Sequence, residues 1–168
     1  GVLDLTTTEW CDELFGGVLT AGPHRLEAAG SHGVPQVVSV GALDMVNFGE
    51  YDSVPARYAE RNLYRHNPTV TLMRTTVEEN RKLGEVIADK LNRAESPTAL
   101  MLPLRGVSMI DAEGQAFYGP EEDAALFDTL RRRVDTGHVD LIEMDNNIND
   151  PAFAEAAAQK LLDLMAKK

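Results

Sequence analysis

The segment from His66 to Thr76 carries residues well suited to hold an anion. Thr71, Arg74 and Thr75 lie close together just before a predicted helix. A guanidinium binds carboxylates and phosphates in a two-pronged geometry, and the first amides of a helix are free to receive an anion. The segment therefore predicts a site with Thr71, Arg74 and Thr75 as ligand-binding residues. The alternative is that the threonines only cap the helix and that Arg74 pairs with one of the chain's many carboxylates.

His66 is the first residue of this segment and the one candidate catalytic residue, because an imidazole exchanges its proton near neutral pH. The other histidines, His24, His32 and His138, are scattered without an HExxH motif or paired spacing, so we expect no histidine-built metal site. Ser108 lacks the glycine pattern of a nucleophile elbow.

A second candidate site is the glycine loop between residues 16 and 23. Gly17 and Gly22 have the spacing of a phosphate loop, but Pro23 and His24 stand where that motif requires Lys and Ser or Thr. The loop is not a Walker motif. It remains usable for an anion, with Gly16, Gly17, Gly22 and Arg25 as ligand-binding residues. The alternative is a helix stop followed by a turn.

The segment 143–150 is rich in side-chain oxygens, which is typical of a calcium-binding loop. In the register of a calcium loop that begins at Asp145, Asp150 stands where Gly is needed and Ala156 stands where Glu is needed. The EF-hand interpretation is therefore rejected. A turn that caps the last helix is the simpler expectation. A role for Asp145 in holding magnesium against the phosphates of a ligand remains open.

Composition limits the class of protein. The chain has 168 residues, 43% hydrophobic and 26% charged, with a net charge of −11. A surface this acidic repels nucleic acid and anionic membranes, so we expect neither as a partner. Cys11 is the only cysteine and no segment is long and apolar enough to span a bilayer, so we expect a cytoplasmic protein.

The pattern of elements predicts an α/β fold with Rossmann-like layers, a mostly parallel sheet and helices on both faces. Apolar strands alternate with amphipathic helices, and this order favours parallel pairing. Adjacent buried strands are predicted over Val34–Val40, Thr98–Leu102 and Val139–Met144. A helix is predicted after a capping box at Thr6 and Glu9, another after Thr76 and Glu79, and a hairpin over Val107–Tyr118.

Several motifs carry a resemblance that runs in order along the whole chain. They are Leu3–Glu9, Gly16–Gly17, Ala21–Pro23 with Arg25–Leu26, Gly41–Asp44, His66–Pro68, Thr71–Thr75, Gly106–Ser108 and Ile148–Phe153. Through them the chain resembles the C-terminal part of an uncharacterised family of large bacterial proteins, to which a plant resistance protein against tomato mosaic virus is related. The resemblance implies two Rossmann-like subdomains, ATP binding near their junction, and self-association. In the plant protein it also implies binding to a viral replication protein.

The resulting expectation is a single α/β domain over residues 1–168, the C-terminal portion of a larger two-subdomain protein. The leading expectation is that the domain binds ATP or another phosphate ligand, with magnesium as a possible cofactor. The chain would then hold half of the binding site, and a missing N-terminal subdomain would complete it. One alternative is an enzyme that acts on a small anionic metabolite through His66 and Arg74. The other is an oligomerisation or protein-interaction module, and a homo-oligomer is expected.

Overall fold

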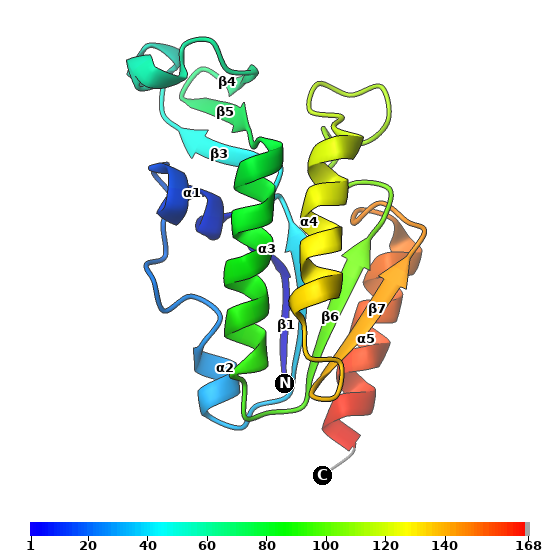
Figure 1. Ribbon diagram of the computed structural model, residues 1–168. Coiled ribbons are helices and arrows are strands. Elements are labelled where there is room, and N and C mark those ends of the chain that lie inside the picture. Colours follow the sequence, from blue (N-terminus) through cyan, green and yellow to red (C-terminus); the bar gives the residue numbers. More distant parts are fainter. Residues whose placement is uncertain (167–168) are drawn as a thin grey trace.

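The computed structural model describes residues 1–166, and its centre is a parallel sheet of four strands (Figure 1). The strands are β1 (Val2–Thr6), β2 (Gln36–Gly41), β6 (Thr98–Pro103) and β7 (Val139–Met144), side by side in that order. All three neighbouring pairs are parallel. The prediction of an α/β fold with three adjacent, parallel strands is confirmed. The predicted burial is confirmed for β2 and β6, whereas β7 lies at the edge of the sheet and is only partly buried.

Helices cover both faces of this sheet, which explains why β2 and β6 are buried along their whole length. Two helices, α3 (Val77–Asn92) and α4 (Pro120–Arg133), lie together on one face, and α5 (Pro151–Ala166) lies on the other (Figure 1). Alternate residues of a strand point to opposite faces. Val38 therefore belongs to the core under α3 and α4, whereas Val37 packs with α5.

A second sheet was not predicted. It is antiparallel, and β5 (Val70–Arg74) lies between β3 (Met45–Phe48) and β4 (Leu63–Asn67). The small sheet sits beyond the carboxyl end of β2 (Figure 1). The segment His66–Thr76, predicted as an anion site, therefore lies largely in a β-hairpin. Its strands are short, and their stability depends on pairing with β3, which is distant in sequence.

Local signals for the helix ends are confirmed in part. The capping box of Thr76 and Glu79 is present at the start of α3. The box predicted at Thr6 and Glu9 is wrong, because Thr6 ends β1 and Thr8 is the residue before α1 (Glu9–Phe15). The helix α1 ends at Gly16 in the left-handed conformation, as the helix-stop alternative for the glycine loop predicts. A short helix, α2 (Ala28–Ser31), and two 3-10 turns, Tyr51–Ser53 and Ala56–Tyr58, complete the elements.

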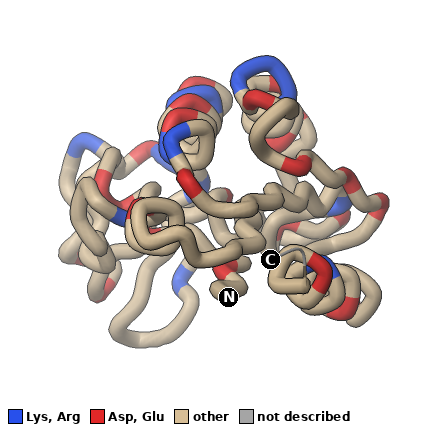
Figure 2. Tube along the Cα trace, turned by 90° about the horizontal axis from the view of Figure 1, so that it is seen from below, with Lys and Arg blue, Asp and Glu red and all other residues tan. Residues whose placement is uncertain are grey.

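The connection between β6 and α4 is a loop, so the predicted hairpin over Val107–Tyr118 is wrong. Its backbone bends at Gly106 and Gly114, both with positive φ. Charged residues lie mainly on the helices and loops around the sheet, with acidic and basic positions interspersed on the helices (Figure 2). Within residues 1–166, no helix combines the length and the apolar character needed to cross a membrane.

Candidate functional site

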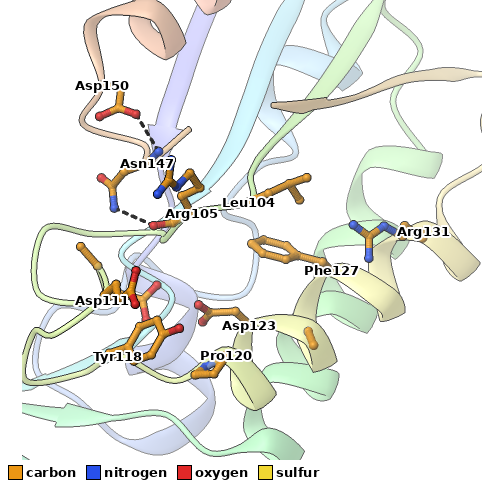
Figure 3. Close-up of a pocket in the computed structure, with 13 residues that line it drawn as sticks. Leu104, Arg105, Asp111, Tyr118, Pro120, Asp123, Phe127, Arg131, Asn147 and Asp150 are labelled. Atoms are coloured by element: carbon orange, nitrogen blue, oxygen red, sulfur yellow. Dashed lines mark hydrogen bonds between the residues drawn. The ribbon is translucent and has the colours of Figure 1, made fainter. Parts of the chain in front are cut away.

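A cleft of about 670 Å³ lies at the carboxyl end of the parallel sheet, between the loops that follow β6 and β7 and the start of α4 (Figure 3). This is the edge at which open parallel sheets bind ligands, and the volume suits a small molecule. The residues that line the cleft are Leu104, Arg105, Asp111, Ala112, Glu113, Tyr118, Pro120, Asp123, Ala124, Phe127, Arg131, Asn147 and Asp150.

A buried ion-pair cluster forms one wall of the cleft. Arg74, at the end of β5, donates from Nη2 to Asp111 Oδ1 at 3.0 Å and to Asp123 Oδ1 at 2.9 Å. Its side chain is 6% exposed, and its Nη2 also donates to the carbonyl of Gly119 at 3.3 Å. The guanidinium thus ties the β6–α4 loop and the first turn of α4 to the small sheet.

The two carboxyl groups of this cluster compete for one cation. Burial raises the pKa of Asp111 to about 8, repulsion from Asp123 adds to the shift, and Arg74 opposes it. Burial also raises the pKa of Asp123, while Arg74 lowers it. The pair therefore retains one proton at neutral pH, which avoids two negative charges beside a single guanidinium.

A third buried carboxyl group, Asp44, lies close to the same cluster. Its side chain is fully buried, and Oδ2 accepts a hydrogen bond of 2.7 Å from the hydroxyl of Ser108. Burial raises the pKa of Asp44 to about 6, while the Ser108 hydrogen bond and the charge of Arg74 lower it. Asp44 is therefore mostly ionised at neutral pH.

Arg105 is the cleft's accessible cation. It follows β6 directly, and its backbone is fixed by bonds to the carbonyl of Asn146 and from the side chain of Asn147. Its side chain is exposed and lines the cleft, and among the described residues no carboxylate lies within ion-pair distance of it. The other lining arginine, Arg131, is already paired with Asp128 and Glu143.

Comparison with known proteins places the chain in a family. The family described as "Uncharacterised protein family (UPF0261) C-terminal domain" matches residues 1–165. The chain belongs to this UPF0261 family. The resemblance read from the sequence motifs is thereby confirmed.

Individual relatives of the UPF0261 family are longer than this chain. A UPF0261 protein of Clostridium tetani is 64% identical over 167 residues, 99% of this chain and 41% of the relative. One from Rhizobium meliloti is 52% identical over 98% of this chain and 42% of its own length. The ToMV resistance protein Tm-1(GCR237) of Solanum lycopersicum is 42% identical over 99% of this chain and 22% of its own length. The chain thus spans less than half the length of these relatives.

The predicted glycine loop of this UPF0261 domain is organised around a carboxylate. Gly16 and Gly17 end α1, and Asp12 accepts the amide of Leu19 at 2.7 Å and that of Asn47 at 2.7 Å. A side chain on Gly17 would meet the Asp12 carboxylate at 2.3 Å. Because the Asp12 carboxylate accepts a hydrogen bond from the Leu19 amide, that amide is not available to an external anion. The helix-stop interpretation therefore describes Gly16 and Gly17.

Two other residues of that loop lie apart from the cleft. Gly22 is at an exposed turn with φ of 80°, and a side chain built there would meet nothing within 4 Å. Arg25 donates to both carboxylate oxygens of Asp4 and also contacts Glu9. Its guanidinium is therefore engaged inside the protein.

The residues predicted around Arg74 are not brought together as a free anion site. Thr71 and Thr75 are buried, and the Thr75 hydroxyl donates to the carbonyl of Leu43. Arg74 itself is held by two aspartates, so the ion-pair alternative describes its position in the structure. His66 is exposed near the hairpin turn, whereas the amide of Arg74 pairs with Asn62 at the other end of β4. The structure separates His66 from Arg74.

Sequence reasoning missed Asp111, Asp123 and Arg105 as residues of the cleft. Asp111 stood in a predicted hairpin turn, and Asp123 was an ordinary acidic residue in the first turn of a helix. A usable signal did exist for Arg105, which directly follows a buried strand in a parallel sheet and so lies at the ligand-binding edge.

Proposed function

We propose that this domain binds a small phosphate-bearing ligand, such as a nucleotide, in the cleft at the carboxyl ends of β6 and β7. The observation that carries the proposal is the exposed guanidinium of Arg105, which lines the cleft without an ion-pair partner in the described chain. A guanidinium in this position can contact two oxygens of one phosphate group. The family resemblance, which implies ATP binding, supports the same ligand class.

The charge of the cleft favours a phosphate that arrives with a divalent cation. Four carboxyl groups, those of Asp111, Glu113, Asp123 and Asp150, line the cleft against two arginines. A bare polyphosphate would be repelled by the ionised carboxylates. Magnesium is commonly held by one or two protein carboxylates together with substrate phosphates, so a magnesium–nucleotide complex has the complementary charge.

A preformed metal cage is not needed for this mode of binding. Within residues 1–166, no three acidic, histidine or cysteine residues are grouped so that they could hold a metal ion by themselves. The exposed carboxylate of Glu113 and the half-buried one of Asp150 are placed to contact a cation that the nucleotide brings. Other contacts to the nucleotide would come from the remainder of the longer protein, so that this cleft supplies half of a site.

Calorimetric titration of the full gene product with ATP and magnesium tests the proposal. We expect binding that weakens strongly when EDTA removes the magnesium. Arg105→Ala should weaken binding by about ten- to a hundredfold, because a hydrogen bond to a charged group contributes about 1.5–3 kcal/mol. Arg93→Ala is the matched control, since Arg93 is also exposed but lies at the opposite end of the sheet. Equal affinity of Arg105→Ala and the parent protein would refute the proposal.

A further inference from the structure

A serine hydroxyl and a buried carboxylate form a pair at a second hollow of the same sheet edge. The hydroxyl of Ser108 donates to Asp44 Oδ2 at 2.7 Å and accepts the amide of Asp111 at 3.2 Å. Ser108 is 8% exposed and lines a hollow of about 260 Å³, while Asp44 is fully buried behind it. The second oxygen of Asp44, Oδ1, has no hydrogen-bond partner among the described residues. The carboxylate thus has spare capacity to accept a proton.

The backbone near the Ser108–Asp44 pair is held in an energetically unfavourable conformation. Ala42, two residues before Asp44, has φ of 57°, which a residue with a side chain rarely adopts. The amide of Ala42 donates to the carbonyl of Val107 at 2.8 Å, so the end of β2 is joined to the loop that carries Ser108. Strain of this kind persists where the surrounding structure holds two segments in a required arrangement. Here it holds the hydroxyl against the carboxylate.

The hollow in front of Ser108 differs in character from the cleft that holds Arg105. Its lining contains no charged residue and consists of Leu5, Thr6, Gly41, Ala42, Val107, Ser108, Met109, Ile148 and Asn149. A phosphoryl group would find no cation there to balance its charge. A neutral acyl group would place its apolar part against side chains such as Leu5 and Ile148.

We propose that Ser108 is a nucleophile and Asp44 its general base in acyl transfer from a neutral ester to water. Ser108 Oγ forms a bond to the acyl carbon, its proton passes to Asp44 Oδ2, and the carbonyl electron pair moves to oxygen. When this intermediate collapses, the bond to the leaving alkoxide breaks and Asp44 returns the proton to it. Water then attacks the acyl-serine ester, its proton passes through Asp44 to Ser108 Oγ, and the carboxylic acid leaves.

The surroundings of Asp44 suit a base that works near neutral pH. Four groups face it: Arg74 from β5, Asp123 from α4, Asp111 from the loop before α4 and Cys11 from α1. Burial is the main cause that raises its pKa to about 6. A carboxylate with that pKa is ionised at pH 7 and accepts a proton more readily than an ordinary aspartate, as general base catalysis requires.

The test is reaction of the full gene product with a fluorophosphonate probe, in which a bond from Ser108 Oγ to phosphorus forms as the P–F bond breaks. Peptide mass analysis should find the label on Ser108, and the rate should rise with pH through about 6 as Asp44 loses its proton. Asp44→Asn should slow labelling at least a hundredfold, within the range that general base catalysis supplies. Hydrolysis of p-nitrophenyl acetate should fall in parallel in Ser108→Ala.

An exposed serine supplies the comparison within the same molecule. The hydroxyl of Ser53 donates to the backbone carbonyl of Glu50 and contacts no carboxylate, so Ser53 should remain unlabelled. Absence of label from Ser108, or a labelling rate there no greater than at Ser53, overturns the proposal. If Asp44→Asn does not fold, the pH profile of the unaltered protein decides: a rate independent of pH between 5 and 8 overturns the role of Asp44.

Discussion

Replacing Arg74 with alanine removes the guanidinium that contacts both Asp111 and Asp123. The residue is 6% exposed, and its Nη2 lies 2.9 Å and 3.0 Å from the two carboxylate oxygens. Without it, Asp123 and Asp44 remain as buried carboxylates with no counter-ion in contact. Breaking a buried ion pair from one side typically costs about 3–5 kcal/mol, because the desolvated charge is left uncompensated. We expect a loss of this size in the free energy of unfolding at pH 7.

The loss should depend on pH in a defined direction. Removing the cation raises the pKa values of the remaining carboxyl groups further, so the folded variant binds more protons than the unfolded chain over a wider pH range. Stability therefore falls more steeply with rising pH in Arg74→Ala than in the parent protein. The destabilisation should be smaller at pH 5, where protonation removes the uncompensated charge, than at pH 8.

Urea unfolding followed by the fluorescence of Trp10, which is 4% exposed in the core, measures both effects. Arg81→Ala is the control, because Arg81 forms an exposed pair with Glu78 on α3, and such pairs contribute less than about 1 kcal/mol. Suppose Arg74→Ala changes the free energy of unfolding by less than about 1 kcal/mol but abolishes nucleotide binding. Arg74 would then be a ligand group, and the assignment of the site to Arg105 would be wrong.

Two further predictions concern the acid pair and the sheet edge. The raised pKa of Asp111 makes the folded chain bind more protons than the unfolded chain, so parent stability should fall as pH rises from about 4 to about 8, by up to about 1.4 kcal/mol per pH unit. Asp111→Asn should flatten this dependence in unfolding curves measured at several pH values, and an unchanged slope would contradict the assignment. Separately, β1 is an edge strand with Val2 36% and Leu3 43% exposed, so the chain should self-associate through it, as the sequence also predicts. Light scattering should show an oligomer that Leu3→Lys shifts towards monomer, and a parent protein that is monomeric at high concentration would contradict this.

The parts of the fold that could be predicted are those specified by neighbouring residues. β2 and β6 are buried on both faces, so they appear in the sequence as continuous apolar runs. The start of α3 is specified by Thr76 and Glu79, whose side chains satisfy each other's backbone amides three residues apart. Neither signal requires knowledge of the rest of the chain.

The small antiparallel sheet depends on contacts that are distant in sequence. β5 pairs with β3, where Met45 lies opposite Arg74, and this pairing leaves no periodic signal in either short strand. A local signal was nevertheless present in the hairpin turn. Asn67 accepts the amide of Thr69 at 2.9 Å, an Asx turn, and Pro68 lies within it. Giving that turn more weight would have predicted a hairpin in place of a ligand loop.

The candidate site could be predicted only as far as its edge of the sheet. Residue type and spacing do not show which guanidinium is free to contact a ligand. That depends on which arginines come into contact with carboxylates in the folded chain. With 27 acidic residues against 16 Lys and Arg, a cation in this chain is more often paired than free. Arg25 and Arg74 both form ion pairs with aspartates that are distant in sequence, whereas Arg105 follows β6 and lines an open cleft. The proposed anion-binding role therefore falls to Arg105, which follows β6 at the ligand-binding edge of the sheet, and not to Arg74.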